Sequence, residues 1–253
     1  MDLYREFKNI IVDRKGHDND SHMKTIKIIG IIEPNKSYRI FSNGLYETIP
    51  YKKQSDNSSV PLIIPQSVMI DNILARWHKE TTDGNYDSNI LGKNGTLVLD
   101  EIELTIPKIE TTSTNLAFYN ARLFHINDVI KFDTSKKMPV TIMNIGENYV
   151  NSFLMNNEKG GGCYLEYHDT PHFHMPLNKN SKGYLILGRN IDFNCYLSAF
   201  EIPYGYAIYT SPYTIHCDAY LIGDYLVVYT MAENYSTVLL KTNINNPIKI
   251  KVI

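Results

Sequence analysis

The sequence predicts a mostly β protein with one helix in its N-terminal part. From Gly95 onward, short runs rich in β-branched and aromatic residues, such as TLVLDEIELTI, VTIMNIG and YLVVYTMA, are separated by Gly, Pro or Asn-Asp clusters. Short strands at near-regular spacing, with turn residues between them, are typical of an all-β sandwich or barrel. No helical period is visible between Gly95 and Thr237, so a parallel α/β sheet is a poor fit.

The first part of the chain mixes apolar runs with polar stretches. The run IKIIGII, at Ile26–Ile32, fits a strand, whereas Pro65–Glu80 is the best helix candidate. One face of that helix would carry the apolar residues Met69, Ile73, Leu74 and Trp77. We therefore expect residues 1–94 to form a strand and helix extension that packs on a β domain of residues 95–253.

The composition of the chain argues against several classes of protein. The formal net charge is -2 and no long basic run occurs, so nucleic acid is not an expected partner. No apolar stretch approaches 18 residues, and the charged N-terminus lacks the apolar core of a secretory signal. The three cysteines are widely spaced, which indicates reduced thiols and a cytoplasmic protein. Homodimer formation would be one way to protect sheet edges.

Histidines are concentrated in YHDTPHFHMPL, at Tyr167–Leu177. His172 and His174 are two residues apart, so in an extended segment they share a face. Neutral imidazoles are common metal ligands, and two on one face form a partial chelate. A third ligand must come from elsewhere, and His216, in YTIHCDAYLIG, is the obvious candidate.

The preceding strand adds polar groups to the same region. In GGGCYLEYH, alternation places Tyr164, Glu166 and His168 on one face, with Cys163, Leu165 and Tyr167 on the other. Alternate residues of the later strand GYLILG would line the interior, either Tyr184 and Ile186 or Leu185 and Leu187.

These motifs resemble the two-motif signature of the cupin superfamily. The matching features are His172-Phe173-His174, the glycine-terminated strand Gly183–Gly188, Pro203-Tyr204-Gly205 and the later His216. The resemblance covers residues 160–235 and suggests a divergent member. It implies a jelly-roll barrel whose interior holds one divalent metal through His172, His174 and His216. The metal would be Fe, Zn, Mn or Ni, and the substrate a small organic molecule.

Two features depart from the family pattern. No acidic residue lies between His174 and Gly188, where the family has its glutamate ligand. Glu166, His168, Asp169 or a water would have to replace it. The later histidine, His216, follows Gly205 by eleven residues, a longer spacing than usual.

Three functions remain open at this point. The first is a metal-dependent enzyme, with His168, Glu166, Asp169 and Tyr184 as the candidate catalytic residues. The second is a metal-free epimerase or isomerase that uses a histidine as general base on a sugar or nucleotide-sugar. The third is a non-catalytic module that binds a ligand or has a structural role. Fold alone does not choose among them.

Overall fold

The computed structural model describes residues 3–49, 63–71, 76–80 and 94–253. Within these residues the chain is mostly β, as the sequence predicts. Fifteen strands belong to one branched sheet, and five more form two small sheets. The helical segments are short: α1 (Leu3–Glu6), η1 (Lys8–Ile10), α2 (Ser113–Phe118) and the π-helical turn η2 (Val150–Leu154).

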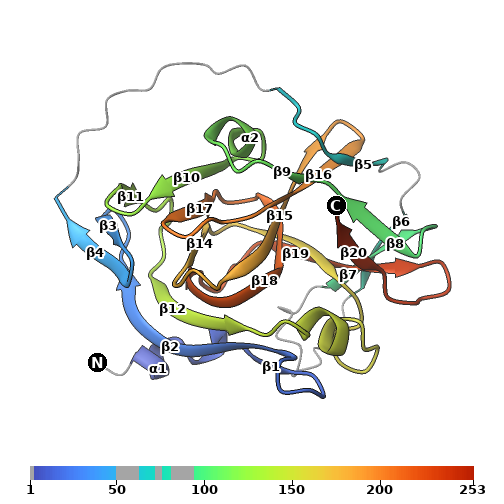
Figure 1. Cartoon of the computed structure of the whole chain (residues 1–253), viewed down its shortest axis with the longest axis horizontal. Helices are drawn as coiled ribbons and strands as arrows, with labels where there is room; N and C mark the ends of the chain where they lie inside the picture. The colour runs from blue at the N-terminus through green and yellow to red at the C-terminus, as the bar shows by residue number, and fades with distance from the viewer. Residues whose placement is uncertain (1–2, 50–62, 72–75, 81–93) are drawn as a thin grey trace.

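The long strand β18 (Ile215–Val228) joins two halves of the large sheet (Figure 1). Its second half pairs with β12 and β14, while its first half pairs with β15 and meets β13. At the junction, Gly223 has a φ of +101°, and a Cβ there would lie 3.0 Å from Cα of Ser181. Glycine thus permits both the backbone conformation and the close approach.

The first half of the large sheet contains the N-terminal strands. It runs through β1 (Asp13–Lys15), β2 (His22–Ile32), β12 (Met138–Ile145), β18, β14 (His172–Pro176), β17 (Tyr206–Thr210) and β10 (Ala121–His125). The N-terminal β2 therefore extends the sheet that carries the His-x-His strand.

The second half of the large sheet contains the strands that connect, directly or through neighbours, to the first half of β18. Its strands are β6 (Arg76–Glu80), β7 (Asn94–Leu99), β19 (Tyr235–Thr242), β13 (Tyr164–His168), β15 (Lys182–Ile191), β16 (Asn194–Phe200), β5 (Val68–Asp71) and β9 (Lys108–Ile109). The strand pairings form no closed ring within the described residues. The sheet is open there, in contrast to the closed barrel that we expected.

Two small sheets complete the structure. One consists of β11 (Val129–Lys131), β3 (Ser37–Phe41) and β4 (Gly44–Thr48), and the other pairs β8 (Glu103–Ile106) with β20 (Lys249–Val252) in parallel. A buried cluster that includes Tyr38, Phe173 and Tyr209 joins the three-stranded sheet to one face of β14 and β17. The opposite face of these strands contributes Ile208 to the larger core.

The helix expected at Pro65–Glu80 is wrong in the parts that the structure describes. Val68–Asp71 forms β5, which pairs with β16, and Arg76–Glu80 forms β6, which pairs with β7. Met69 is 52% exposed whereas Ile70 is buried, which is the two-residue alternation of a strand. Pairing with sequence-distant strands overrides the local helical pattern. The expected apolar residues Ile73 and Leu74 lie outside the described residues.

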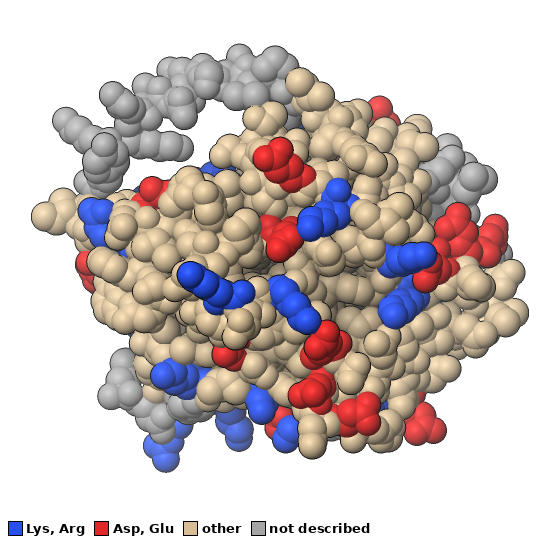
Figure 2. Space-filling view, in the orientation of Figure 1, with Lys and Arg blue, Asp and Glu red and all other residues tan. Residues whose placement is uncertain are grey.

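Surface charge and helix length complete the description. On the face shown in Figure 2, Lys and Arg side chains are interspersed with Asp and Glu. No helix in the described part of the chain is long and apolar enough to cross a membrane.

Candidate metal centre

Strands β13, β14 and β18 bring four buried histidines together. His172 is the central one: its ring centroid lies 4.5 Å from that of His168, 5.4 Å from that of His174 and 4.8 Å from that of His216. Imidazoles from chain segments more than forty residues apart thus converge, with His216 joining the His172 and His174 strand as expected.

Strand alternation explains why these side chains share one space. On β14, Phe173 and Met175 point into the cluster with the three-stranded sheet, so His172 and His174 point the other way. On β13, Glu166 is the register partner of His216 on β18. Paired residues on neighbouring strands project from the same face.

A polar contact at Nδ1 orients two of the rings. Nδ1 of His216 donates to the carbonyl of Thr214 at 2.9 Å, and Nδ1 of His168 lies 3.1 Å from Oγ1 of Thr170. The Nε2 atoms of both rings are buried and have no hydrogen-bond partner in the part of the chain that the structure describes. A histidine held through one ring nitrogen presents the other to a ligand, as metal-binding histidines do.

Two carboxylates border the histidines. Oε1 of Glu166 lies 3.4 Å from Nε2 of His216, and Oδ2 of Asp218 lies 3.5 Å from Nε2 of His174. Both separations are longer than ordinary hydrogen bonds. The other Asp218 oxygen accepts a hydrogen bond from the Tyr164 hydroxyl at 2.5 Å, which holds this carboxylate in place.

The side chains form two groups that could hold a metal ion. One group is His168, His172 and His216, and the other is His172, His174 and Asp218. Within each group the ligand atoms lie within 4.8 Å of one another, and every member is buried. Imidazole and carboxylate donors together suit Zn, Fe, Mn or Ni.

The buried ring nitrogens are suited to binding a metal ion. Ring nitrogens of His168, His172, His174 and His216 are buried without hydrogen-bond partners among the described residues. A buried polar group without a partner costs about 1–3 kcal/mol, so native proteins rarely leave several together. A cation bound by these nitrogens would remove that cost.

Burial and neighbouring charges control the protonation of the rings. Burial, together with nearby His216, lowers the pKa of His168 to about 4, and burial among the other histidines lowers the pKa of His172 well below its ordinary value. Burial also lowers the pKa of His216, but the Glu166 carboxylate more than offsets this and leaves the pKa raised. His168 and His172 are therefore neutral near pH 7, as metal ligation requires.

A small cavity opens beside this cluster. Its volume is about 80 Å³, and Glu166, His168, His172 and Asp218 form its polar wall. The N-terminal segment forms much of the rest, through Ile10, Val12, Arg14 and Met23. Residues that the sequence assigned to an N-terminal extension packing on the β domain thus help to line the cavity.

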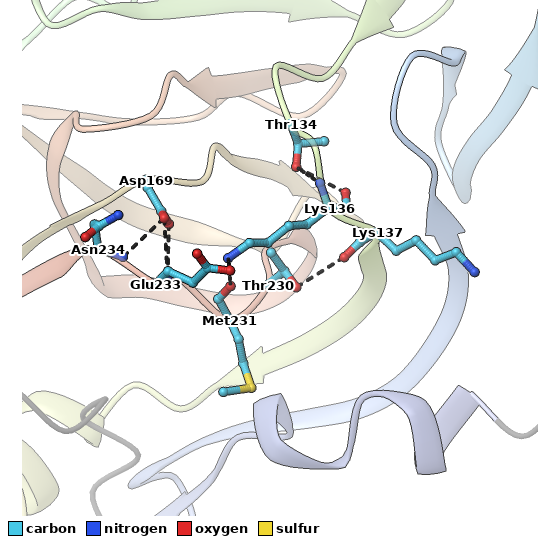
Figure 3. Close-up of polar contacts among 8 residues, drawn as sticks. All are labelled: Thr134, Lys136, Lys137, Asp169, Thr230, Met231, Glu233 and Asn234. Carbon is cyan, nitrogen blue, oxygen red and sulfur yellow. Dashed lines mark hydrogen bonds and ion pairs between the residues drawn. The ribbon is translucent and has the colours of Figure 1, made fainter.

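Two of the expected catalytic residues do not line this cavity. The Asp169 carboxylate accepts hydrogen bonds from the backbone N–H groups of Glu233 and Asn234, at 3.1–3.3 Å, and so fixes the turn before β19 (Figure 3). Tyr184 is half-buried, with Nζ of Lys108 lying 5.6 Å from its ring centroid, and it does not line the cavity. Neither residue is among those that line the cavity beside the histidines.

The expected ligand trio is arranged differently. His172 and His216 belong to one group, whereas His174 belongs to the group with Asp218. His168, expected as a catalytic residue, takes the third place beside His172 and His216. Glu166 lies beside this group, in keeping with its role as a candidate replacement ligand.

Sequence reasoning assigned no role to three residues of the site. Asp218 could have been found, because His216-Cys217-Asp218 has the same two-residue spacing as the His-x-His motif. Tyr164 shares its strand face with Glu166. Arg14 carries no local signal, because only the pairing of β1 with β2 places it beside the cavity.

Comparisons with known proteins identify no relative. No family model matches the chain, and neither the curated proteins nor the solved structures include a significant match. The geometry of the site must therefore support any proposal on function.

Proposed function

We propose that this protein is a metal-dependent enzyme that acts on a small organic molecule in the cavity beside the histidine cluster. The observation that carries the proposal is the set of buried ring nitrogens on His168, His172, His174 and His216 that have no hydrogen-bond partner in the described structure. A divalent cation is the partner that satisfies several lone pairs of neutral imidazoles at once.

His168, His172 and His216 would hold the ion, with Glu166 or Asp218 available as an oxygen ligand. With three protein ligands, such an ion would have a coordination position available for water or substrate, as in catalytic rather than structural sites. The ion would supply Lewis acidity or activate a bound water or substrate. The chain's own residues would orient the ligands: Thr214 holds His216, Thr170 faces His168 and Tyr164 fixes Asp218.

The lining and the volume of the cavity also help to assess the alternative function, a metal-free epimerase or isomerase. Glu166 beside His216 has the arrangement of a general base and the group that orients it. However, a volume of about 80 Å³ accommodates roughly five water-sized groups, far fewer than the atoms of a nucleotide-sugar. Size therefore favours a small substrate, or the reacting end of a larger one, in either mechanism.

Metal analysis tests the proposal. The protein is purified without an affinity tag or metal resin, and its metal content is measured by mass spectrometry. We expect close to one divalent ion per chain, lost in His172→Ala and in His216→Ala. The matched control is His125→Ala, because His125 is exposed and lies at the end of β10 against Tyr206.

Two other results of the metal analysis would count against a metal-dependent enzyme. A protein that contains no metal, and that takes up none from Zn²⁺, Mn²⁺, Fe²⁺ or Ni²⁺ solutions, would overturn the proposal. Stoichiometric metal without turnover on a broad panel of small molecules would instead favour a non-catalytic binding module.

A further inference from the structure

A second cleft lies on the surface, apart from the cavity beside the histidines. Its volume is about 560 Å³, against about 80 Å³ for the histidine cavity, and the two share no lining residue among those described. Its walls come from the end of α2, from residues 188–190 of β15 and from residues 213–215, which lead into β18. Tyr167 of β13 completes the lining.

Two exposed tyrosines flank this cleft. Tyr167 is 39% exposed and Tyr213 is 58% exposed. Their ring centroids lie 6.4 Å apart, and the ring planes are inclined by 50°. Because Tyr167 alternates along β13 with Glu166 and His168, it projects from the strand face opposite to the histidine cluster. The two rings therefore leave aromatic surface open to solvent, on which a ligand can stack.

The backbone of Tyr213 is held in an uncommon conformation. Its φ is +64°, in the left-handed region that bulky side chains seldom adopt, and Asn120, also in the cleft wall, has a φ of +57°. The Tyr213 N–H donates to the carbonyl of His168 at 2.7 Å, and the Thr214 hydroxyl donates to the carbonyl of Asn120 at 3.3 Å. Such conformations are unfavourable and persist where surrounding contacts fix them, often at binding sites. The ring that this turn presents is mostly exposed, so packing in the core does not explain it.

The polar groups of the cleft suit an uncharged ligand. Among the described residues, Arg189 is the one charged side chain that lines it. Its Nη1 donates to the carbonyl of Phe118 at 2.6 Å, and its Cζ lies 5.3 Å from the centroid of the Phe118 ring. Asn120 and Asn190 are exposed, and their amides both donate and accept hydrogen bonds. This set matches a ligand that carries hydroxyl groups better than it matches an ion.

We propose that this cleft binds a neutral saccharide. The faces of aromatic rings carry partial negative charge and attract the C–H groups on one face of a pyranose ring. Saccharide hydroxyls donate and accept hydrogen bonds, as the amides of Asn120 and Asn190 do. A volume of about 560 Å³ lies in the range of about 300–1,000 Å³ that is usual for small-molecule sites. The inference goes beyond the proposed function and does not depend on the metal centre.

A glycan array tests the proposal on the whole protein. Fluorescently labelled protein is applied to immobilised neutral and carboxylated glycans, and the dissociation constant of each neutral glycan that binds is then measured by calorimetry. We expect neutral glycans to bind in preference to carboxylated ones. Loss of one stacking ring, in Tyr167→Ala or Tyr213→Ala, should weaken that binding by about five- to tenfold, whereas Tyr213→Phe, which keeps the ring, should weaken it by less than about threefold.

The matched control is Tyr204→Ala, because Tyr204 is 43% exposed and is not among the residues that line the cleft. It should bind the glycan as the unaltered protein does. Thermal melting of each variant shows whether it is folded. Metal content and glycan binding are separate readouts, so either proposal can fail alone.

Three results would overturn the saccharide inference. The first is the absence of binding to every neutral glycan, and the second is binding that folded Tyr167→Ala and Tyr213→Ala variants retain in full. Adenine and benzoate, which also stack on tyrosine rings, are titrated alongside the glycans. Tighter binding of either compound than of any neutral saccharide would indicate a site for flat aromatic ligands instead.

Discussion

Replacing His172 by Leu should separate the stability of the protein from its capacity to bind metal. His172 is 8% exposed, has an unpartnered Nδ1 within the described structure, and is the only residue that belongs to both ligand groups found there. Without metal, the imidazole is a buried polar group that makes too few hydrogen bonds. Leu has a similar volume and no polar atom to satisfy.

The magnitudes follow from these two effects. Removing an unsatisfied buried nitrogen regains about 1–3 kcal/mol, from which repacking of a different side-chain shape subtracts up to about 1.5 kcal/mol. The metal-free variant should thus be about 1 kcal/mol more stable than the metal-free natural protein. A metal at a thousand times its dissociation constant should stabilise the natural protein by about 4 kcal/mol and the variant hardly at all.

Urea unfolding with EDTA, and again with excess Zn²⁺, measures both effects. His125→Leu, at an exposed position, should change neither quantity. The reasoning would be refuted by a variant that is several kcal/mol less stable in EDTA and that gains as much stability from Zn²⁺ as the natural protein.

Three further predictions concern the metal-free protein. Its free energy of unfolding should fall as pH drops from about 6.5 to about 4, because burial lowers the pKa of His168 in the folded protein to about 4, whereas the unfolded chain binds that proton near 6.5. Urea unfolding at several pH values should show that His168→Gln removes roughly 3 kcal/mol of this pH-dependent loss of stability. Tyr164→Phe removes a buried hydrogen bond to a carboxylate and should cost about 1.5–3 kcal/mol, whereas Tyr167→Phe, at an exposed position, should cost under about 0.5 kcal/mol. Gly223→Ala should lower the melting temperature more than Gly205→Ala, since both have positive φ but only the first is crowded; equal shifts would contradict this.

Several features of the site could be predicted from the sequence. The two-residue periodicity of strands placed His172 and His174 on one face, and His216 was the expected distant imidazole that would join them. The same rule applied to His216-Cys217-Asp218 would also have identified Asp218, which binds the Tyr164 hydroxyl.

Other features depend on long-range pairing that no local pattern reveals. Asp169 lies beside the histidines in sequence, yet its carboxylate accepts hydrogen bonds from backbone N–H groups of the turn before β19. Arg14 reaches the cavity because β1 pairs with β2 and β2 pairs with β12. The apolar period within Pro65–Glu80 suggested a helix, but β16 and β7 provide strand partners for its described parts.

The central claim is that a metal ion binds where β13, β14 and β18 meet. The most direct measurement is an anomalous difference map from crystals of the protein as purified, recorded on both sides of the absorption edge of the metal. The account predicts one strong peak at about 2.0–2.2 Å from Nε2 of His168, Nε2 of His216 and a ring nitrogen of His172. A cavity without a peak, in crystals soaked with each candidate metal, would contradict it.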